Sequence, residues 1–430
     1  MTIRRQIENL INGRQIIPAE HRRNFQHLFQ DIAWFGLLNG STTAFIAIYA
    51  ARIGANAAQV GLINALPAIV SLFLSLPTGS WLKNKRIDRS VFFISIAQRI
   101  FFLFLVPIPL LANFHSQLFL VLMIIFVMSI PNVGIQVGFN VLFGDVIPDN
   151  WRGYVAGIRN SVFALVTIVT SLGCGYLLKT LPFPNGYIVV FALGFLGAAM
   201  SSFHLYHIRI PKQDSQTDSA DIERPGKERF EVKKFISTLR DRVRGQLRVE
   251  IFTGPFKRVL FSVWGFNFAL YLAIPLFPLW LVNHLGFTDQ ILGFGNALFY
   301  GGMFIGSMSL SRISKKLGHR GVTGLGMVLL SSYPLLMALS SIRILYFIGS
   351  GLGGMAWSLA GGALLNYILE RVPENERPSH LGWYNLGANA CILLSTTLGP
   401  LVSEVTGIFP ALLIFAGARV VSGIAILIWG

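Results

Sequence analysis

Long apolar stretches separated by short polar segments run along nearly the whole chain. Twelve of them have the length of about 20 residues that a helix needs to cross the hydrocarbon core of a membrane. They cover 27–51, 58–82, 90–112, 117–143, 153–178, 185–207, 256–283, 289–311, 320–341, 343–369, 379–403 and 407–429. The pattern predicts an all-α polytopic membrane protein with 12 transmembrane helices.

Composition supports the membrane class. Apolar residues make up 53% of the 430-residue chain and charged residues only 13%, which excludes an ordinary soluble globular protein. The first 24 residues are polar and basic, so we expect no removable signal peptide. Cys174 and Cys391 fall inside predicted spans, so we expect neither a disulfide nor a thiolate metal site.

The net charge of +16 is distributed as a membrane topology requires. If the N-terminus is cytoplasmic, 29 of the 35 Lys and Arg residues lie in cytoplasmic segments and only Arg52, Lys179 and Arg343 lie in outside loops. This asymmetry follows the positive-inside rule and argues against a nucleic-acid partner. We therefore predict an inner or plasma membrane protein with both termini in the cytoplasm.

A central polar stretch divides the predicted spans six plus six. The expected units are a cytoplasmic N-terminal segment (1–26), a six-helix bundle (27–207), a cytoplasmic central loop (208–255) and a second six-helix bundle (256–430). Within the loop, apolar residues between Val232 and Leu247 recur at helical spacing among basic ones. This pattern indicates an amphipathic helix on the inner membrane face, with calmodulin-type partner binding as the alternative.

The two halves share polar and glycine residues at equivalent span boundaries. With an offset of 232, Gly54, Gly61, Asn64, Ala65, Leu66 and Lys83 fall on Gly286, Gly293, Asn296, Ala297, Leu298 and Lys315. With an offset of 225, Asp145, Pro148, Asp149, Asn150, Arg152, Gly157 and Asn160 fall on Glu370, Pro373, Glu374, Asn375, Arg377, Gly382 and Asn385. Such matches indicate an internal duplication, as is common in transporters.

The second repeat carries a motif of the form acid-x-x-Pro-x-x-x-Arg. It runs from Asp145 to Arg152 after the fourth span and from Glu370 to Arg377 after the tenth. Two copies at repeat-related positions, with the six-plus-six layout, resemble the major facilitator superfamily over nearly the whole chain. The resemblance implies two pseudo-symmetric six-helix bundles that transport a solute by alternating access.

A second motif of that family, a basic loop after the second and eighth spans, is matched in part. Its basic residues are present here, although lysine replaces the motif's acidic residue in both loops. The resemblance implies that Asp145 and Glu370 form an inner gate that locks the outward-facing state. Their expected partners are Lys83, Lys85, Arg86, Lys315, Lys316, Arg152 and Arg377. The alternative is that both carboxylates cap helix ends and satisfy charge at the interface.

In the same family the first and fourth spans of each half line the central cavity. Independently, the fourth span carries Asn132, Gln136 and Asn140 four residues apart, a polar stripe that would be costly against lipid. The other candidate cavity residues are Asn39, Trp264, Asn267, Tyr271, Trp357 and Asn366. Amides and aromatic rings suit a small-molecule pocket. Polar packing between helices is the alternative for each of them.

Few charges lie deep in the membrane. Asp31 is expected just inside the cytoplasmic edge, so the cavity should be nearly neutral and favour a neutral, zwitterionic or amphipathic substrate. We expect Arg159 to pair with Asp145. Arg99 is expected to snorkel or pack, with an ion pair to Asp31 and proton coupling as the alternative. Arg419 has no evident partner.

Other classes of function are less well supported. No His/Glu metal pair, catalytic constellation or Gly-rich phosphate loop is visible, so we expect no enzyme, no metal, no cofactor and no ATP-driven pump. A lipid flippase or scramblase of the same fold and a polytopic membrane enzyme stay open. The predicted function is a secondary active transporter. Its expected partners are the bilayer and a small-molecule substrate, with protons or another coupling ion as candidates.

Overall fold

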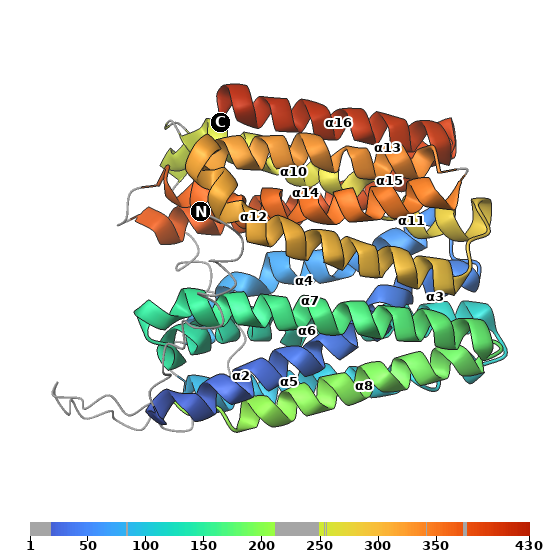
Figure 1. Cartoon of the computed structure of the whole chain (residues 1–430), viewed down its shortest axis with the longest axis horizontal. Coiled ribbons are helices and arrows are strands. Elements are labelled where there is room, and N and C mark those ends of the chain that lie inside the picture. The colour runs from blue at the N-terminus through green and yellow to red at the C-terminus, as the bar shows by residue number, and fades with distance from the viewer. Residues whose placement is uncertain are drawn as a thin grey trace, which may run out of the picture.

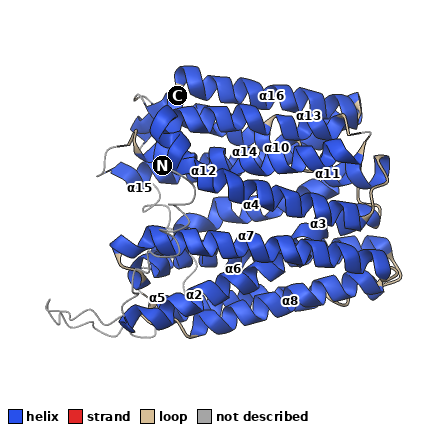
Figure 2. Ribbon diagram, viewed as in Figure 1, coloured by secondary structure: helices blue, strands red, loops and turns tan. Residues whose placement is uncertain are grey.

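The computed structural model describes residues 19–82, 85–210, 249–252, 254, 256–340, 342–372 and 376–430. Within these ranges the chain is helical and contains no strand, as Figure 2 shows. The predicted all-α class is confirmed. The predicted amphipathic helix of the central loop lies outside the described residues.

The first half begins with a composite span, in which α2 (Ala19–Leu38) continues through a π-helical segment (Asn39–Thr43) into α3 (Ala44–Arg52). Five long helices follow: α4 (Ala57–Leu82), α5 (Ile87–Leu105), α6 (Phe114–Val146), α7 (Asp149–Thr180) and α8 (Asn185–Tyr206). Because α2 begins at Ala19, the first span starts before the predicted boundary at residue 27.

The second half repeats this order. Its first span consists of α10 (Phe256–Leu272), α11 (Leu276–Leu279) and a π-helical segment (Trp280–His284). Then come α12 (Asp289–Leu330), α13 (Ser332–Ala338), α14 (Arg343–Leu369), α15 (Arg377–Thr406) and α16 (Ile408–Trp429).

Eleven continuous helical stretches in the described residues are long and apolar enough to cross a membrane. One of them, Asp289–Ala338, contains two of the predicted spans, 289–311 and 320–341. The chain changes direction between them at Gly318, whose φ of 69° is a backbone conformation that glycine adopts at little cost. The difference from the predicted twelve spans is therefore this one tight connection.

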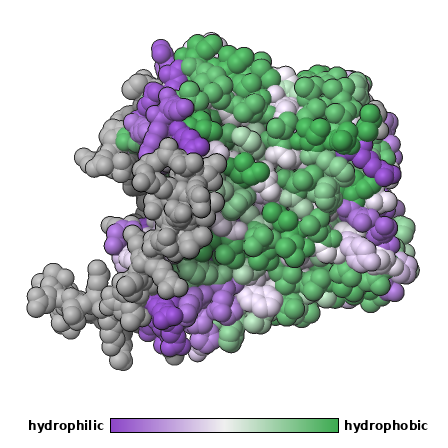
Figure 3. Space-filling model, in the orientation of Figure 1, coloured by the Kyte–Doolittle hydropathy of each residue, from purple (hydrophilic) through white to green (hydrophobic). Residues whose placement is uncertain are grey.

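Both ends of the described chain lie at the same end of the bundle (Figure 1). We call this end the terminus side and the opposite end the distal side. Helices α2 to α8 form one half and α10 to α16 the other. In the view of Figure 3, apolar residues cover the middle of the surface and hydrophilic residues gather at both ends. This is the surface that a membrane-spanning protein presents to lipid and to two aqueous phases.

The two halves meet where α7 packs against α12 and α4 against α15. Glycines permit this close approach. A Cβ atom at Gly61 would lie 2.5 Å from the carbonyl oxygen of Thr396, and one at Gly293 would lie 2.6 Å from that of Ser171. Neither position has room for a side chain, so small residues fix the contact between the halves.

The buried apolar residues show how the halves are joined. On the distal side one cluster contains residues of both halves, among them Phe45 and Tyr49 of the first and Leu276 and Trp280 of the second. On the terminus side each half has its own cluster. The first half's includes Phe25, Leu28, Leu82 and Val155, and the second half's includes Phe256, Leu260, Met327 and Tyr367. The halves thus share a core at the distal side and have separate cores at the terminus side.

Arg419 of α16 closes a break in the second half. Pro275 cannot continue α10, so the carbonyl groups of its last turn lack partners within the helix. Arg419, only 1% exposed, donates from Nη2 to the oxygen of Leu270 at 2.7 Å and from Nη1 to that of Leu330, at the end of α12, at 3.1 Å. Its Nε lies 3.5 Å from the oxygen of Ala269. The guanidinium therefore caps two helix ends, which explains how this charge is buried with no acidic partner among the described residues.

Candidate functional site

A polar latch joins the two halves at the distal surface. Arg52, at the end of α3, donates from Nη2 to the backbone oxygen of Phe287 at 2.5 Å. Its Nη2 and Nε also lie 3.1 and 3.2 Å from Oδ1 of Asp289, at the start of α12. The side chains are 28% and 13% exposed, so this ion pair is partly shielded from water. We refer to Arg52, Phe287 and Asp289 as the distal latch.

Further contacts between the halves lie deeper. Asn39 donates from Nδ2 to the hydroxyl of Tyr300 at 2.6 Å, and Asn296 donates from Nδ2 to the hydroxyl of Ser171 at 2.7 Å. The ring of Tyr300 also meets Phe163 edge-on, with centroids 5.8 Å apart. Asn39 opens the π-helical segment of the first span, a distortion often found at functional sites.

Sequence reasoning identified Asn39 but not most of its surroundings. Tyr300, Phe163 and Ser171 are ordinary residues of apolar helices, and nothing in their local pattern shows that they face the other half. Asn296 did carry a signal, because it aligns with Asn64 in the internal repeat. The outside location of Arg52 was predicted, but its partner Asp289 could be found only from the packing of α12 beside α3.

The polar stripe of the fourth span lies on the terminus-side part of α6. Asn132 is half-buried and Gln136 and Asn140 are exposed. The large apolar residues of α6 that are exposed, such as Phe126 and Ile130, are rotated away from this stripe by roughly a third of a turn or less. The stripe thus lies beside the exposed apolar face of the helix.

The candidate residues of the second half have more local contacts. Asn267 is buried and donates to the oxygen of Val263 in its own helix at 2.9 Å. Trp264 is half-buried, packs against Gly387 of α15, and its Nε1 has no partner among the described residues. Tyr271 and Trp357 are half-buried, and Asn366 is exposed near the end of α14. The structure does not gather these five side chains into one hydrogen-bonded group within the described residues.

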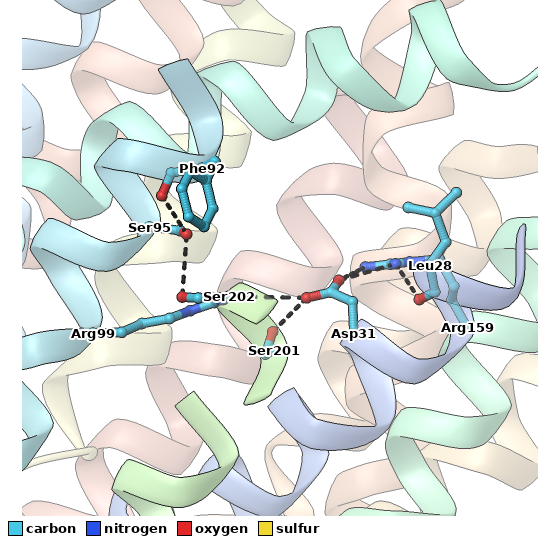
Figure 4. Close-up of polar contacts among 8 residues, drawn as sticks. All are labelled: Leu28, Asp31, Phe92, Ser95, Arg99, Arg159, Ser201 and Ser202. Atoms are coloured by element: carbon cyan, nitrogen blue, oxygen red, sulfur yellow. Dashed lines mark hydrogen bonds and ion pairs between the residues drawn. The ribbon is translucent and has the colours of Figure 1, made fainter. Parts of the chain in front are cut away.

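A buried charge cluster lies inside the first half (Figure 4). Arg159 of α7 places Nη1 and Nη2 3.2 Å from Oδ2 of Asp31 in α2, and Nη1 also donates to the oxygen of Leu28 at 2.6 Å. Arg99 of α5 has Nη2 3.8 Å from Oδ1 of Asp31. The hydroxyl of Ser201 donates to Asp31, and Arg99 donates from Nη1 to Ser202 at 3.0 Å. We call Asp31, Arg99 and Arg159 the charge triad.

The triad corrects two predictions. Arg159 pairs with Asp31 and not with Asp145, because the length of α7 carries it away from the exposed carboxylate at the end of α6. Asp31 is only 3% exposed, because side chains of α5, α7 and α8 contact it. The pair of Arg99 with Asp31, which was the alternative interpretation, is present. One carboxylate shared by two guanidinium groups leaves an excess positive charge in the buried interior of the first half.

The predicted gating residues lie at the terminus side. Arg152 donates to the oxygens of Gly144 and Ile147 at 2.7 and 3.2 Å, so it caps the end of α6. Glu370 is 2.6 Å from Nδ1 of His319. The other described side chains of this group are exposed: Asp145, Lys85, Arg86, Lys315 and Lys316. Lys83 lies outside the described residues, as does the side chain of Arg377.

Arg86 and Lys85 have local contacts. Arg86 forms an ion pair with Asp88 at 3.1 Å, and Lys85 lies 6.0 Å from the ring centre of Trp81. These contacts stay within the first half. The contacts of Arg152, Arg86 and Lys85 described above lie in the first half and that of Glu370 lies in the second, so the gating hypothesis concerns another conformation.

Comparisons with known proteins agree with this architecture. Two solved structures of the nucleoside transporter NupG, one of them a point mutant, are 14% identical to the chain. The structure without the mutation has a TM-score of 0.63, and the match covers 95% of this chain and 98% of that one. The mutant has a TM-score of 0.67, and the match covers 94% of this chain and 100% of that one. A bacterial homologue of the human lysosomal transporter Spinster, solved in an inward-facing and unoccupied conformation, is also 14% identical. Its TM-score is 0.62, with 96% of both chains covered.

Among curated proteins, no sequence matches significantly. The family model of the Major Facilitator Superfamily, however, matches residues 32–266 and 259–430. These two matches together span nearly the whole chain and correspond to its two halves. The chain belongs to the Major Facilitator Superfamily of membrane transporters.

Proposed function

We propose that the protein is a secondary active transporter that moves a small organic solute by alternating access. The observation that carries this proposal is the asymmetry of the contacts between the halves. The distal latch, the hydrogen bonds between the halves and the shared core join the two halves from the middle of the bundle to the distal side. At the terminus side each half has its own core. Such an arrangement opens and closes by rocking of two rigid bundles.

The orientation of this state follows from the charge distribution. If the positive-inside rule holds, the terminus side is cytoplasmic and the distal side is outside, in the inner or plasma membrane. The structure then represents the inward-facing state. The proposed domains are the units inferred from the sequence: 1–26, 27–207, 208–255 and 256–430.

We favour a neutral, zwitterionic or amphipathic substrate. The candidate cavity residues carry amides and aromatic rings, while the charge triad is buried inside one half. Such groups hydrogen-bond and stack on a neutral heterocycle. Nucleosides, for which the similar nucleoside transporter NupG is named, are therefore the first substrates to test.

The gate and the coupling site occupy different places in this proposal. In the outward-facing state, Asp145 and Glu370 would pair with the basic residues of the terminus side, and Glu370 would leave His319. The charge triad is the candidate coupling site, because protonation of Asp31 would release two guanidinium groups at once.

The test is solute flux into proteoliposomes, with a panel of nucleosides and other metabolites, and with and without an imposed pH gradient. Saturable uptake of one compound, enhanced by the gradient, supports coupled transport. The triad is then tested with Asp31→Asn, for which gradient-driven uptake should fall while exchange of the solute at equal pH persists. Movement of labelled lipid without solute flux would instead indicate a flippase, and chemical conversion of a panel compound would indicate an enzyme.

A further inference from the structure

The first half contains an apolar groove that faces away from the second half. It lies between α5 and α8, which pack against each other and against α6 and α2, and its volume is about 590 Å³. Phe92, Ile96, Ile100, Phe195 and Phe203 line it, and Arg99 lies at its base. Ile96, Ile100 and Phe203 are 40–52% exposed, so in a membrane these side chains face lipid.

The groove ends at a basic rim on the terminus side. A smaller cavity of about 300 Å³ shares Phe92 and Tyr206 with the groove and is lined further by Asp88, Arg89 and Arg209. Arg89 and Arg209 are exposed, and the guanidinium of Arg209 lies 5.7 Å from the ring centre of Tyr206. Asp88 is already paired with Arg86 at 3.1 Å. The carboxylate therefore does not neutralise the two arginines of the rim.

The buried wall adds to this positive field. Arg99 and Arg159 share the single carboxylate of Asp31, which leaves one excess positive charge behind the groove. The Nε of Arg99 is buried and has no hydrogen-bond partner among the described residues. A positive charge in a low-dielectric wall acts over a longer distance than one in water. The groove and its rim thus favour an anionic occupant over a zwitterionic one.

We propose that this groove is a binding site for an anionic phospholipid of the terminus-side leaflet. One acyl chain lies between Phe92, Ile96 and Phe203, and the phosphate lies at the rim between Arg89 and Arg209. Basic pockets between transmembrane helices at a membrane surface bind anionic head groups in this way. A volume of about 590 Å³ lies within the range of roughly 300–1,000 Å³ found for sites that hold small organic molecules.

The proposal is tested by lipid binding to the purified protein, independently of transport. Native mass spectrometry in detergent measures retention of phosphatidylglycerol against phosphatidylcholine with the same acyl chains. The wild-type protein should retain phosphatidylglycerol preferentially. The double variant Arg89→Ala/Arg209→Ala should lower its affinity for phosphatidylglycerol about thirtyfold and that for phosphatidylcholine, whose choline offsets the phosphate charge, by less.

Two further variants distinguish lipid binding in the groove from attraction of lipid by positive surface charge in general. Ala199→Leu narrows the apolar part and should weaken retention while the rim stays intact. Lys257→Ala/Arg258→Ala removes two charges from a cavity of the second half, near the start of α10, and should leave the groove's preference unchanged. An equal loss in this control, or equal retention of both lipids by the wild-type protein, would overturn the proposal.

A labelling experiment covers the case in which a variant does not fold. A phosphatidylglycerol analogue with a diazirine in its acyl chain is photolysed in liposomes with the wild-type protein. Peptides from α5 and α8 should carry the label, and excess unlabelled phosphatidylglycerol should reduce it more than phosphatidylcholine does. Labelling that avoids α5 and α8, or that both lipids reduce equally, would contradict the site.

Discussion

Arg52→Ala removes the distal latch with one substitution. The variant loses the hydrogen bond to the oxygen of Phe287 and both contacts with Asp289. These contacts exist only while the distal side is closed, because they join α3 of one half to the start of α12 in the other. Their loss should therefore destabilise this state relative to the state that is open on the distal side.

The size of the shift can be worked from the contacts. A partly exposed ion pair contributes about 0.2–1 kcal/mol, and a hydrogen bond from a charged donor to a carbonyl about 1.5 kcal/mol at the lower end of its range. Arg52 is 28% exposed, so the low values apply and the total is about 2 kcal/mol. This free energy corresponds to a roughly thirtyfold change in the ratio of the two states.

Spin labels on the distal side measure this ratio. Lys179→Cys at the end of α7 and Val405→Cys at the end of α15 place one exposed label on each half, in a background with Cys174→Ala and Cys391→Ala. Double electron–electron resonance should show a longer-distance population that grows in Arg52→Ala. Arg343→Ala, which removes another exposed distal arginine, is the control. Distance distributions that are the same in Arg52→Ala, Arg343→Ala and the parent would refute the latch.

Three other substitutions probe buried contacts. Asp31→Asn leaves Arg99 and Arg159 without a carboxylate and should lower the free energy of unfolding by about 3–5 kcal/mol. Adding Arg159→Gln should restore part of this free energy. An unchanged Tm in detergent would argue against the triad. Arg419→Met leaves the carbonyls of Leu270 and Leu330 unpaired and should cost about 2–4 kcal/mol by thermal unfolding; the cap is unimportant if its Tm equals that of the parent. Gly293→Val places a side chain against the backbone oxygen of Ser171 and should hold the distal side open. A cysteine introduced by Ser171→Cys should then react faster with a membrane-impermeant thiol reagent. An unchanged reaction rate speaks against this contact.

Much of the fold could be predicted because lipid imposes a simple rule on sequence. Each span needs about 20 apolar residues, and basic residues mark the loops of one side. The connection at Gly318 lies in the polar gap that separates two predicted spans, 289–311 and 320–341. In the structure the first span and the beginning of the second both belong to α12, which is interrupted only at Gly318. The repeat and its paired motifs then indicated the family that the comparison confirms.

The contacts between helices could not be predicted in the same way. A buried arginine needs a partner, but the sequence does not show which helix supplies it. Arg159 pairs with Asp31 on α2 and not with the motif residue Asp145, which is nearer in the sequence. Arg419 binds backbone carbonyl groups that the break at Pro275 leaves without helical partners. Both choices depend on how α2, α7, α10 and α16 pack. The same is true of Asp289, whose role in the latch depends on the arrangement of the halves.

The most direct test of alternating access is to fix the distal side closed and measure transport. Arg52→Cys and Asp289→Cys, in the background without Cys174 and Cys391, are joined by a bifunctional thiol reagent, and flux of the identified solute into proteoliposomes is followed. Rocking of the two halves predicts that cross-linking stops flux and that reduction of a cleavable linker restores it. The reagent should not change the flux through either single cysteine variant. Continued flux through fully cross-linked protein would contradict alternating access.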